Sequence, residues 1–100
     1  MTRPQDTRSP ILVVEDEPAI RDLIAMLLTD EGYEPLVASN GAVALDLVRQ
    51  TPPRLILLDL MMPVMDGRAF LRACRAEALC QDVPVVVMSA AYTADFAKGD

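Results

Sequence analysis

Apolar residues along this chain occur in two alternating patterns: short continuous runs, and longer stretches in which they repeat at helical spacing. The short runs are rich in branched aliphatic residues and predict four strands, at Ile11–Val14, Pro35–Ser39, Arg54–Leu60 and Val83–Ala90. Pro35 fits only the start of its strand or a sheet edge, because proline lacks the amide hydrogen that a sheet needs. Runs without polar interruption are typical of strands that are covered on both faces.

Between the first three strand candidates, two stretches predict amphipathic helices. The first begins near Pro18, which fits a first helical turn, and ends at Gly32. Its apolar stripe comprises Ile20, Leu23, Ile24, Leu27 and Leu28. The second follows Asn40-Gly41 and ends at Thr51–Pro53, since the residue before a proline avoids the helical region. The residues that we expect to face inward from the second helix are Val43, Ala44, Leu47 and Val48.

A third helix is predicted after the third strand. Asp66 can cap it, and its helical pattern runs from Gly67 to about Ala78. Phe70, Leu71 and Cys74 lie on its apolar side. Strands and helices therefore alternate along the chain, which favours an α/β fold with a parallel sheet covered by helices on both faces.

Composition supports one small globular domain. The chain has 100 residues, of which 52% are hydrophobic and 24% charged, enough for a packed core of modest size. Its net charge of −6 argues against direct nucleic-acid binding by this segment, because neutralising phosphates needs a basic patch. The absence of histidine excludes catalysis with a histidine base, histidine-ligated metals and pH sensing by imidazole.

Several features predict a cytoplasmic protein without membrane spans. Cys74 and Cys80 lack the Cys-x-x-Cys spacing of zinc and redox motifs, so we expect reduced packing or surface residues. No apolar run approaches the roughly 18–20 residues that span a bilayer. Residues 1–9 are polar and lack a signal-peptide core, so we expect a short flexible tail ahead of a domain at residues 10–100.

Acidic residues follow two of the predicted strands. Glu15 and Asp16 come directly after the first strand, and Asp59 closes the third, an apolar run that would not ordinarily end in an acid. Ligands of open parallel sheets bind outside the carboxyl ends of the strands. If the first and third strands are neighbours, the three carboxylates meet in one crevice, and their repulsion requires a cation or a raised pKa. An all-oxygen ligand set suits Mg2+, or Mn2+, with water molecules completing the octahedron.

Simpler explanations exist for some of these residues. Acids are favoured at helix N-termini, so Glu15, Asp16 and Glu17 alone are equally well explained as the solvated start of a helix. Asp59 favours the cation site instead. Ser89 ends the fourth strand at the same rim, although a serine in that position is more often a turn or cap residue.

Three segments together resemble the receiver domain of two-component response regulators, of the chemotaxis-regulator kind. The segment "ILVVEDEPAIRDLI" is similar to the family's first strand with its acidic pair, and "LILLDLMMPVMDG" to the strand and loop of its phospho-acceptor aspartate. "VPVVVMSA" is similar to its fourth strand, which ends in Ser or Thr and then Ala. The resemblance covers about residues 11–98. It implies a flavodoxin-like, doubly wound parallel sheet with strand order 2-1-3-4 and the fifth strand missing.

The resemblance also implies roles for the acidic residues. Asp59 would accept a phosphoryl group from a phosphohistidine on a sensor histidine kinase or phosphotransfer protein. Glu15 and Asp16 correspond to the acids that bind Mg2+, with Glu15 able to act through a water molecule. The backbone carbonyl of Met61 would complete the protein ligands.

Around the phosphoryl group, the resemblance implies that Ser89 donates a hydrogen bond in the active form and that the amide of Ala90 helps to hold it. The family's fifth-strand lysine, and the aromatic switch residue before it, would fall past residue 100. Lys98 and Tyr92 lie too near Ser89 to take those roles. We therefore expect a receiver without its last strand and helix, as a fragment or with a partner on the edge of the fourth strand.

The leading hypothesis is a phospho-accepting signalling switch, which catalyses its own phosphorylation and dephosphorylation but is not an enzyme in the strict sense. The alternative is a binding or dimerisation module that keeps the receiver fold without switching. In that case a homodimer or a strand-swapped partner would cover the fourth strand. A metal-dependent phosphatase with an aspartyl nucleophile is disfavoured, because such enzymes commonly carry a second Asp where this chain has Met61.

Overall fold

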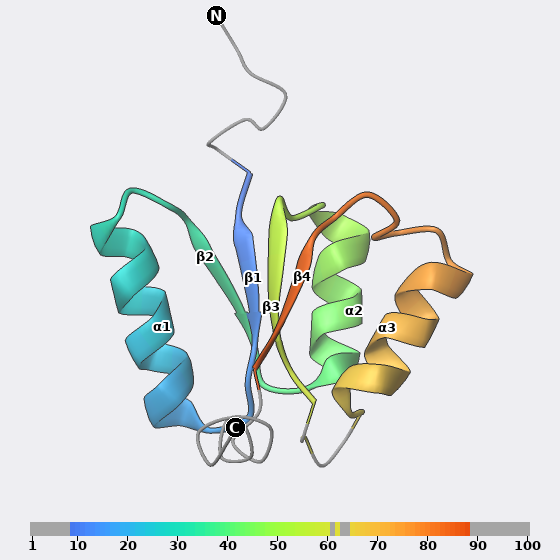
Figure 1. The fold of residues 1–100 in the computed structure, drawn as a ribbon, viewed down its shortest axis with the longest axis horizontal. Helices are drawn as coiled ribbons and strands as arrows, with labels where there is room; N and C mark the ends of the chain where they lie inside the picture. The colour runs from blue at the N-terminus through green and yellow to red at the C-terminus, as the bar shows by residue number, and fades with distance from the viewer. Residues whose placement is uncertain (1–8, 61, 63–64, 89–100) are drawn as a thin grey trace, which may run out of the picture.

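The structure, a computed structural model, describes residues 9–60, 62 and 65–88, and it alternates strands with helices as the sequence predicts (Figure 1). The elements are β1 (Ile11–Val14), α1 (Pro18–Asp30), β2 (Pro35–Ala38), α2 (Gly41–Gln50), β3 (Leu55–Asp59), α3 (Gly67–Ala76) and β4 (Val85–Met88). The four strands and three helices predicted above are present. β2 is one residue shorter than predicted, β3 and α3 are each about two residues shorter, and β4 begins two residues later than predicted. The predicted tail at residues 1–9 lies almost wholly outside the described residues.

The four strands form one parallel sheet in the order β2-β1-β3-β4. The predicted strand order is therefore confirmed. β1 is a central strand, and its register places Val14 beside Ala38 of β2 and Leu58 of β3. Since all strands run the same way, their carboxyl ends meet at one edge of the sheet, at the bottom of Figure 1.

The core lies between the sheet and the pair of helices α2 and α3, which cover one face, whereas α1 is the only helix of the described residues on the other face (Figure 1). Its buried members are Leu12, Val14, Ala38, Ala44, Leu45, Val48, Ile56, Leu58, Met62, Phe70, Cys74 and Cys80. Phe70 is the largest fully buried side chain. Burial of this apolar set is the main force that holds α2 and α3 against the sheet.

Strand β3 shows how unequally the two faces are covered. Ile56 and Leu58 point to the α2–α3 face and are fully buried, whereas Leu55 and Leu57 on the other face are only half-buried. Among the described residues, helix α1 packs mainly on β1 and β2, which leaves Leu55 and Leu57 of β3 only partly covered on that face. The continuous apolar run of β3 nevertheless suits a strand with two covered faces.

The apolar stripe predicted for α1 is not buried, and this corrects the expectation from the sequence. Ile20, Leu23 and Leu27 are each about half exposed, and no residue of α1 is buried. Ile24 and Leu28 face the sheet and are half-buried. The helix is amphipathic, but only the part of its stripe that meets β1 and β2 has a partner among the described residues.

The inward face of α2 is also rotated relative to the prediction. Val43 is 41% exposed, whereas Leu45, which was not expected to face inward, is buried. The buried positions start at Gly41 and continue at Ala44, Leu45 and Val48, a regular helical repeat. The prediction began the inward repeat at Val43, although glycine itself occupies the first inward position.

Both cysteines are free and buried, as expected for reduced packing residues. Burial raises the pKa of the Cys74 thiol to about 12, and its neighbour Cys80 adds to the shift. Because the thiolate is the reactive form, the shift makes Cys74 a poor nucleophile. Among the described residues, no helix has the length and apolar character that a membrane span requires.

An exposed ion pair joins α2 to the end of α3. Arg49 donates from Nε and Nη2 to the two carboxylate oxygens of Glu77, at 2.9 and 2.7 Å, and from Nη1 to Asp46 at 3.0 Å. The two-pronged geometry is the strongest that a guanidinium and a carboxylate can form. Pairing with Arg49 lowers the pKa of Glu77.

Glu77→Gln is expected to lower the midpoint of thermal unfolding slightly at neutral pH. A carboxyl with a lowered folded-state pKa stabilises the fold above its unfolded pKa, and loses that contribution as pH falls through the folded-state pKa. Thermal unfolding followed by circular dichroism should therefore show a difference from wild type near pH 7 that disappears at acid pH, once the Glu77 carboxyl is protonated in the folded chain. High salt should reduce it too, because both side chains are exposed. A difference independent of pH would contradict this.

Candidate functional site

Three carboxylates meet at the carboxyl edge of the sheet, where the sequence predicts a cation site. Glu15 and Asp16 directly follow β1, and Asp59 is the last residue of β3. Because β1 and β3 are adjacent and parallel, their ends place these side chains together. One carboxylate oxygen from each residue lies within 4.8 Å of the other two. The predicted convergence of the three acids is therefore confirmed.

Hydrogen bonds that involve backbone atoms fix the position of Glu15 at the carboxyl edge of the sheet. Its amide donates to the carbonyl oxygen of Ala38 at 3.0 Å, which extends the pairing of β1 with β2 by one bond. Its Oε2 accepts a hydrogen bond from the amide of Glu17 at 3.0 Å. Arg21 donates from Nη1 to the carbonyl oxygen of Glu15 at 3.2 Å, and so places a positive charge behind the acid rather than on its carboxylate.

Burial and the neighbouring acids disfavour the charged form of Glu15 in this cluster. Glu15 and Asp59 are 5% and 7% exposed, and Asp16 is half-buried. Burial raises the pKa of Glu15 above its ordinary value, and the charges of Asp59 and Asp16 raise it further. The amide of Glu17 opposes this shift by stabilising the charged form. Packing two buried acids beside a third is costly unless a cation compensates for the repulsion.

The donor set fits a hard divalent cation. All three side chains offer carboxylate oxygens, which Mg2+ and Mn2+ prefer, and the oxygens are close enough to share one ion. Sulfur and imidazole ligands are absent from the cluster. The chemistry of the residues therefore agrees with the predicted metal class.

The segment after Asp59 is held by contacts at both ends. The amide of Gly67 donates to the carbonyl oxygen of Leu60 at 3.4 Å, and a β-carbon on Gly67 would lie 2.8 Å from the carbonyl oxygen of Asp59. Asp66 caps α3 as predicted, with Oδ1 accepting from the amide of Ala69 at 2.8 Å. The glycine is required because the start of α3 passes directly against the end of β3.

Sequence reasoning missed one contact of this segment. The carbonyl oxygen of Met65 accepts a hydrogen bond from the amide of Gly41, at the start of α2, at 3.0 Å. The Asn40-Gly41 pair signalled only a helix start. Three other predicted site residues, Met61, Ser89 and Ala90, lie outside the described residues.

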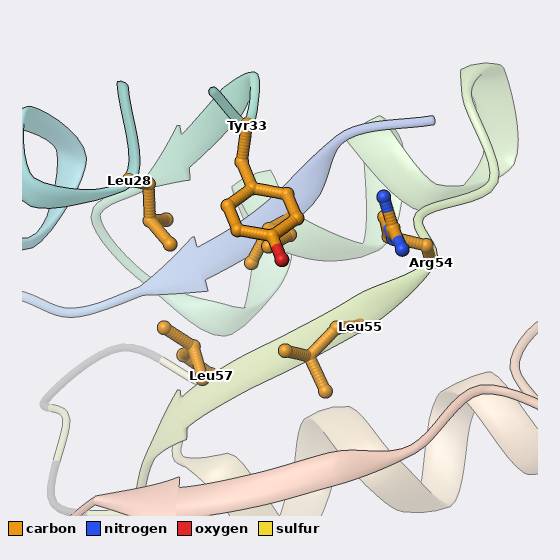
Figure 2. Close-up of a pocket in the computed structure, with 6 residues that line it drawn as sticks. Leu28, Tyr33, Arg54, Leu55 and Leu57 are labelled. Atoms are coloured by element: carbon orange, nitrogen blue, oxygen red, sulfur yellow. The ribbon is translucent and has the colours of Figure 1, made fainter. Parts of the chain in front are cut away.

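A separate cavity of about 380 Å³ lies at the opposite edge of the sheet (Figure 2). Its lining residues are Ile11, Leu28, Tyr33, Arg54, Leu55 and Leu57. The guanidinium of Arg54 lies over the ring of Tyr33, 5.2 Å from its centroid. Ile11 and Leu55 begin their strands, so this cavity is remote from the acids that follow the strand ends.

Fold and site together define a doubly wound α/β domain with an acidic cluster that could hold a cation at the carboxyl edge of its sheet. The sequence model of the response regulator receiver domain matches residues 11–99. The chain therefore belongs to the response regulator receiver family, as the three sequence segments imply.

Similar curated proteins are transcriptional regulators. The transcriptional regulatory protein BaeR of Escherichia coli is 46% identical over 88 residues, which are 87% of this chain and 35% of BaeR. The phosphate regulon regulator PhoB of Escherichia coli is 38% identical over 80 residues, with 80% of this chain and 35% of PhoB covered. The chain thus spans about a third of the length of these relatives.

Solved structures show the same fold. The chemotaxis protein CheY4 of Vibrio cholerae superposes with a TM-score of 0.76 at 28% identity, covering 90% of this chain and 78% of that one. The response regulator TrrA of Thermotoga maritima, solved in complex with Mg2+-BeF, gives a TM-score of 0.74 at 33% identity, covering 89% and 77%. These similarities confirm the predicted receiver fold.

Proposed function

We propose that the chain is the phospho-accepting receiver of a two-component system and that Asp59 is its acceptor. The observation that carries this proposal is a buried carboxylate at the end of β3, beside two further acids, in a chain of the receiver family. The phosphoryl donor is a sensor histidine kinase or a phosphotransfer protein. The receiver unit spans residues 10–100, with residues 1–9 as a tail, and acts in the cytoplasm.

The residues present suit transfer to a carboxylate. Glu15, Asp16, Asp59 and the backbone carbonyl of Met61 would hold Mg2+, which supplies charge neutralisation for the incoming phosphoryl group. An oxygen of Asp59 forms the new bond to phosphorus while the bond to the donor breaks, and the electron pair leaves with the donor. No base is needed, since a carboxylate nucleophile carries no proton that has to be removed. The end of β3 holds Asp59 in a fixed direction.

Phosphorylation would be detected by two residues after β4. Ser89 donates a hydrogen bond to a phosphoryl oxygen, and the amide of Ala90 holds the same group. Their support is the sequence match of "VPVVVMSA" to the family's fourth strand, together with the position of β4 next to β3 in the sheet. Binding at these atoms would change the surface offered to partner proteins or to an output domain.

The comparisons support a signalling role beyond the fold itself. BaeR and PhoB are regulators of transcription by name, and TrrA was solved with Mg2+-BeF. By analogy, this receiver takes Mg2+ and switches its interactions with a partner or an output domain. This segment does not contact nucleic acid directly, because its net charge of −6 opposes binding to phosphates.

The direct test is intact-mass spectrometry after incubation with acetyl phosphate and Mg2+. Wild type is expected to gain the mass of one phosphoryl group, and the adduct should be lost on mild alkaline treatment because an acyl phosphate hydrolyses readily. Omission of Mg2+ should prevent the gain. A chain that stays unmodified with saturating acetyl phosphate and Mg2+ would overturn the proposal.

A second candidate role, a binding or dimerisation module, is favoured by the exposure of β4. This strand is at the edge of the described sheet, and Val86 and Val87 are 49% and 40% exposed. An apolar edge strand readily pairs with another chain. A homodimer or a swapped strand would then cover the edge.

Size-exclusion chromatography with light scattering should therefore detect dimers or larger assemblies of the wild-type chain. Val86→Lys is expected to shift the population toward monomer, because an edge lysine opposes strand pairing. Val43→Lys is the matched control, since Val43 is 41% exposed, similar to Val86, but lies on α2. A wild-type chain that is monomeric across a wide concentration range would contradict this role.

A further inference from the structure

Gly41 is in direct contact with the loop that follows the acceptor strand. It is buried at the first position of α2, immediately after Asn40, whose Oδ1 caps the helix by accepting from the amide of Val43 at 2.9 Å. Instead of bonding within its helix, the amide of Gly41 donates to the carbonyl oxygen of Met65 at 3.0 Å. One amide at a helix start therefore satisfies a carbonyl of the β3–α3 loop.

The contact leaves no room for a side chain at position 41. A β-carbon there would lie 2.5 Å from the carbonyl oxygen of Met65 and 2.7 Å from its Cγ. Gly41 does not have a positive φ, unlike Gly32, whose φ is 90°. The glycine is thus required by the closeness of the loop, and not by the conformation of its own backbone.

The position of this contact along the chain gives it a consequence for the site. The loop starts at Asp59, fixed in β3, and returns to the sheet at Gly67, whose amide bonds to Leu60. Met65 is the point between them that α2 holds. Met65 is two residues before Gly67, whose amide bonds to Leu60 and whose backbone passes close to the carbonyl oxygen of Asp59. A shift of Met65 would therefore displace the start of α3 against the end of the strand that carries the acceptor.

We propose that Gly41 is a positioning residue, which acts through Met65 and the start of α3 to hold the end of β3 in the geometry that binds the cation and accepts the phosphoryl group. The proposal rests on the function proposed above for Asp59. It adds that α2, which supplies none of the acids, sets the geometry of their site. Small displacements of a reacting group by remote contacts can reduce rates by up to about 10²-fold.

A pair of glycine variants separates this role from a general loss of stability. Gly41→Ala places a methyl group against the carbonyl oxygen of Met65. Gly32→Ala introduces strain instead, because alanine disfavours a φ of 90°, although nothing lies within 4 Å of its β-carbon. Gly32 follows α1 at the opposite edge of the sheet from the acids. Both variants should therefore unfold more easily than wild type, for unrelated reasons.

The measurements are the dissociation constant for Mg2+, from a metal titration followed by NMR, and the rate of phosphorylation by acetyl phosphate at saturating Mg2+. Gly41→Ala is expected to weaken Mg2+ binding and to slow phosphorylation by about tenfold or more. Gly32→Ala should change both by less than about twofold. Unfolding midpoints in urea, measured for all three chains, show whether the two variants are comparably destabilised.

A folded Gly41→Ala chain with wild-type Mg2+ affinity and phosphorylation rate would overturn the proposal, and so would equal losses in Gly32→Ala. If Gly41→Ala does not fold, Met65→Gly loosens the same loop without adding volume at position 41 and should give the same losses. Wild type is the reference for the proposed function. If wild type neither binds Mg2+ nor accepts a phosphoryl group, both proposals fail together. If wild type is fully active, an unaffected Gly41→Ala chain contradicts only the proposal for Gly41.

Discussion

Asp59→Asn is expected to abolish the phosphoryl adduct that wild type forms with acetyl phosphate and Mg2+. Asparagine has nearly the same shape as aspartate, so β3 should keep its register and the variant should fold. The neutral amide, however, is a far weaker nucleophile than a carboxylate, and it also removes one negative charge from the cation site. The expected loss is therefore complete rather than partial.

The matched control is Asp66→Asn, in the same loop. Asp66 is exposed and its role is to cap α3, a role that asparagine performs about equally well. Intact mass spectra of wild type and both variants, recorded under one set of conditions, are compared for the added phosphoryl group. Asp66→Asn should be modified like wild type.

Two results would contradict the assignment of Asp59. Persistence of the adduct in Asp59→Asn would place the phosphoryl group on another residue. Loss of the adduct in both variants would indicate that the loop as a whole, and not the Asp59 carboxylate, is needed. Peptide mapping after reduction with borohydride, which converts an acyl phosphate to an alcohol, would identify the modified residue in wild type.

The central site could be predicted from the sequence because its residues are fixed by strand ends. An acid after a continuous apolar run stands out, and parallel strands necessarily bring their carboxyl ends together. Glu15, Asp16 and Asp59 needed only the adjacency of β1 and β3, which the structure confirms. Strands with a period of two leave little freedom in where the last residue points.

The predictions that were wrong concern the buried faces of α1 and α2, because the burial of a helix face depends on what packs against it. Hydrophobic spacing predicts that α1 is amphipathic, but it does not state what covers Ile20 and Leu23, which remain half exposed. The phase of α2 was wrong at Val43, because glycine carries no hydrophobic signal yet fills an inward position at Gly41. For the same reason the contact of Gly41 with Met65 was missed, since it depends on tertiary approach of two backbones.

Mg2+ should stabilise the fold, and removing an acid of the cluster should remove that effect. A ligand that binds only the folded state adds RT ln(1 + [L]/Kd), which is about 1.4 kcal/mol at ten times Kd. In a chain of this size such a gain raises the midpoint of thermal unfolding by roughly 5–10 °C. Glu15→Gln should lose most of the Mg2+-dependent shift, while its amide oxygen can still accept the hydrogen bond from Glu17.

The pH dependence without metal follows from the raised pKa of Glu15. A carboxyl with a folded-state pKa above its unfolded value of 4.5 binds its proton more tightly in the folded chain. Its contribution to stability is therefore full below the unfolded pKa and is lost as pH rises through the folded-state pKa. In EDTA, Glu15→Gln should be more stable than wild type at neutral pH, and this advantage should vanish toward acid pH.

The control for lost charge is Glu34→Gln, because Glu34 is exposed and precedes β2 at the edge of the sheet remote from the cluster. It should keep the full Mg2+ response and show no gain in EDTA. Thermal unfolding of the three chains, with EDTA and with Mg2+, gives both readings in one experiment. Equal Mg2+ shifts in wild type and Glu15→Gln would mean that the ion binds elsewhere. The two expected effects of Glu15→Gln therefore have opposite signs. The substitution stabilises the metal-free chain, but it removes the stabilisation that Mg2+ gives to wild type, as expected for an acid that binds the cation.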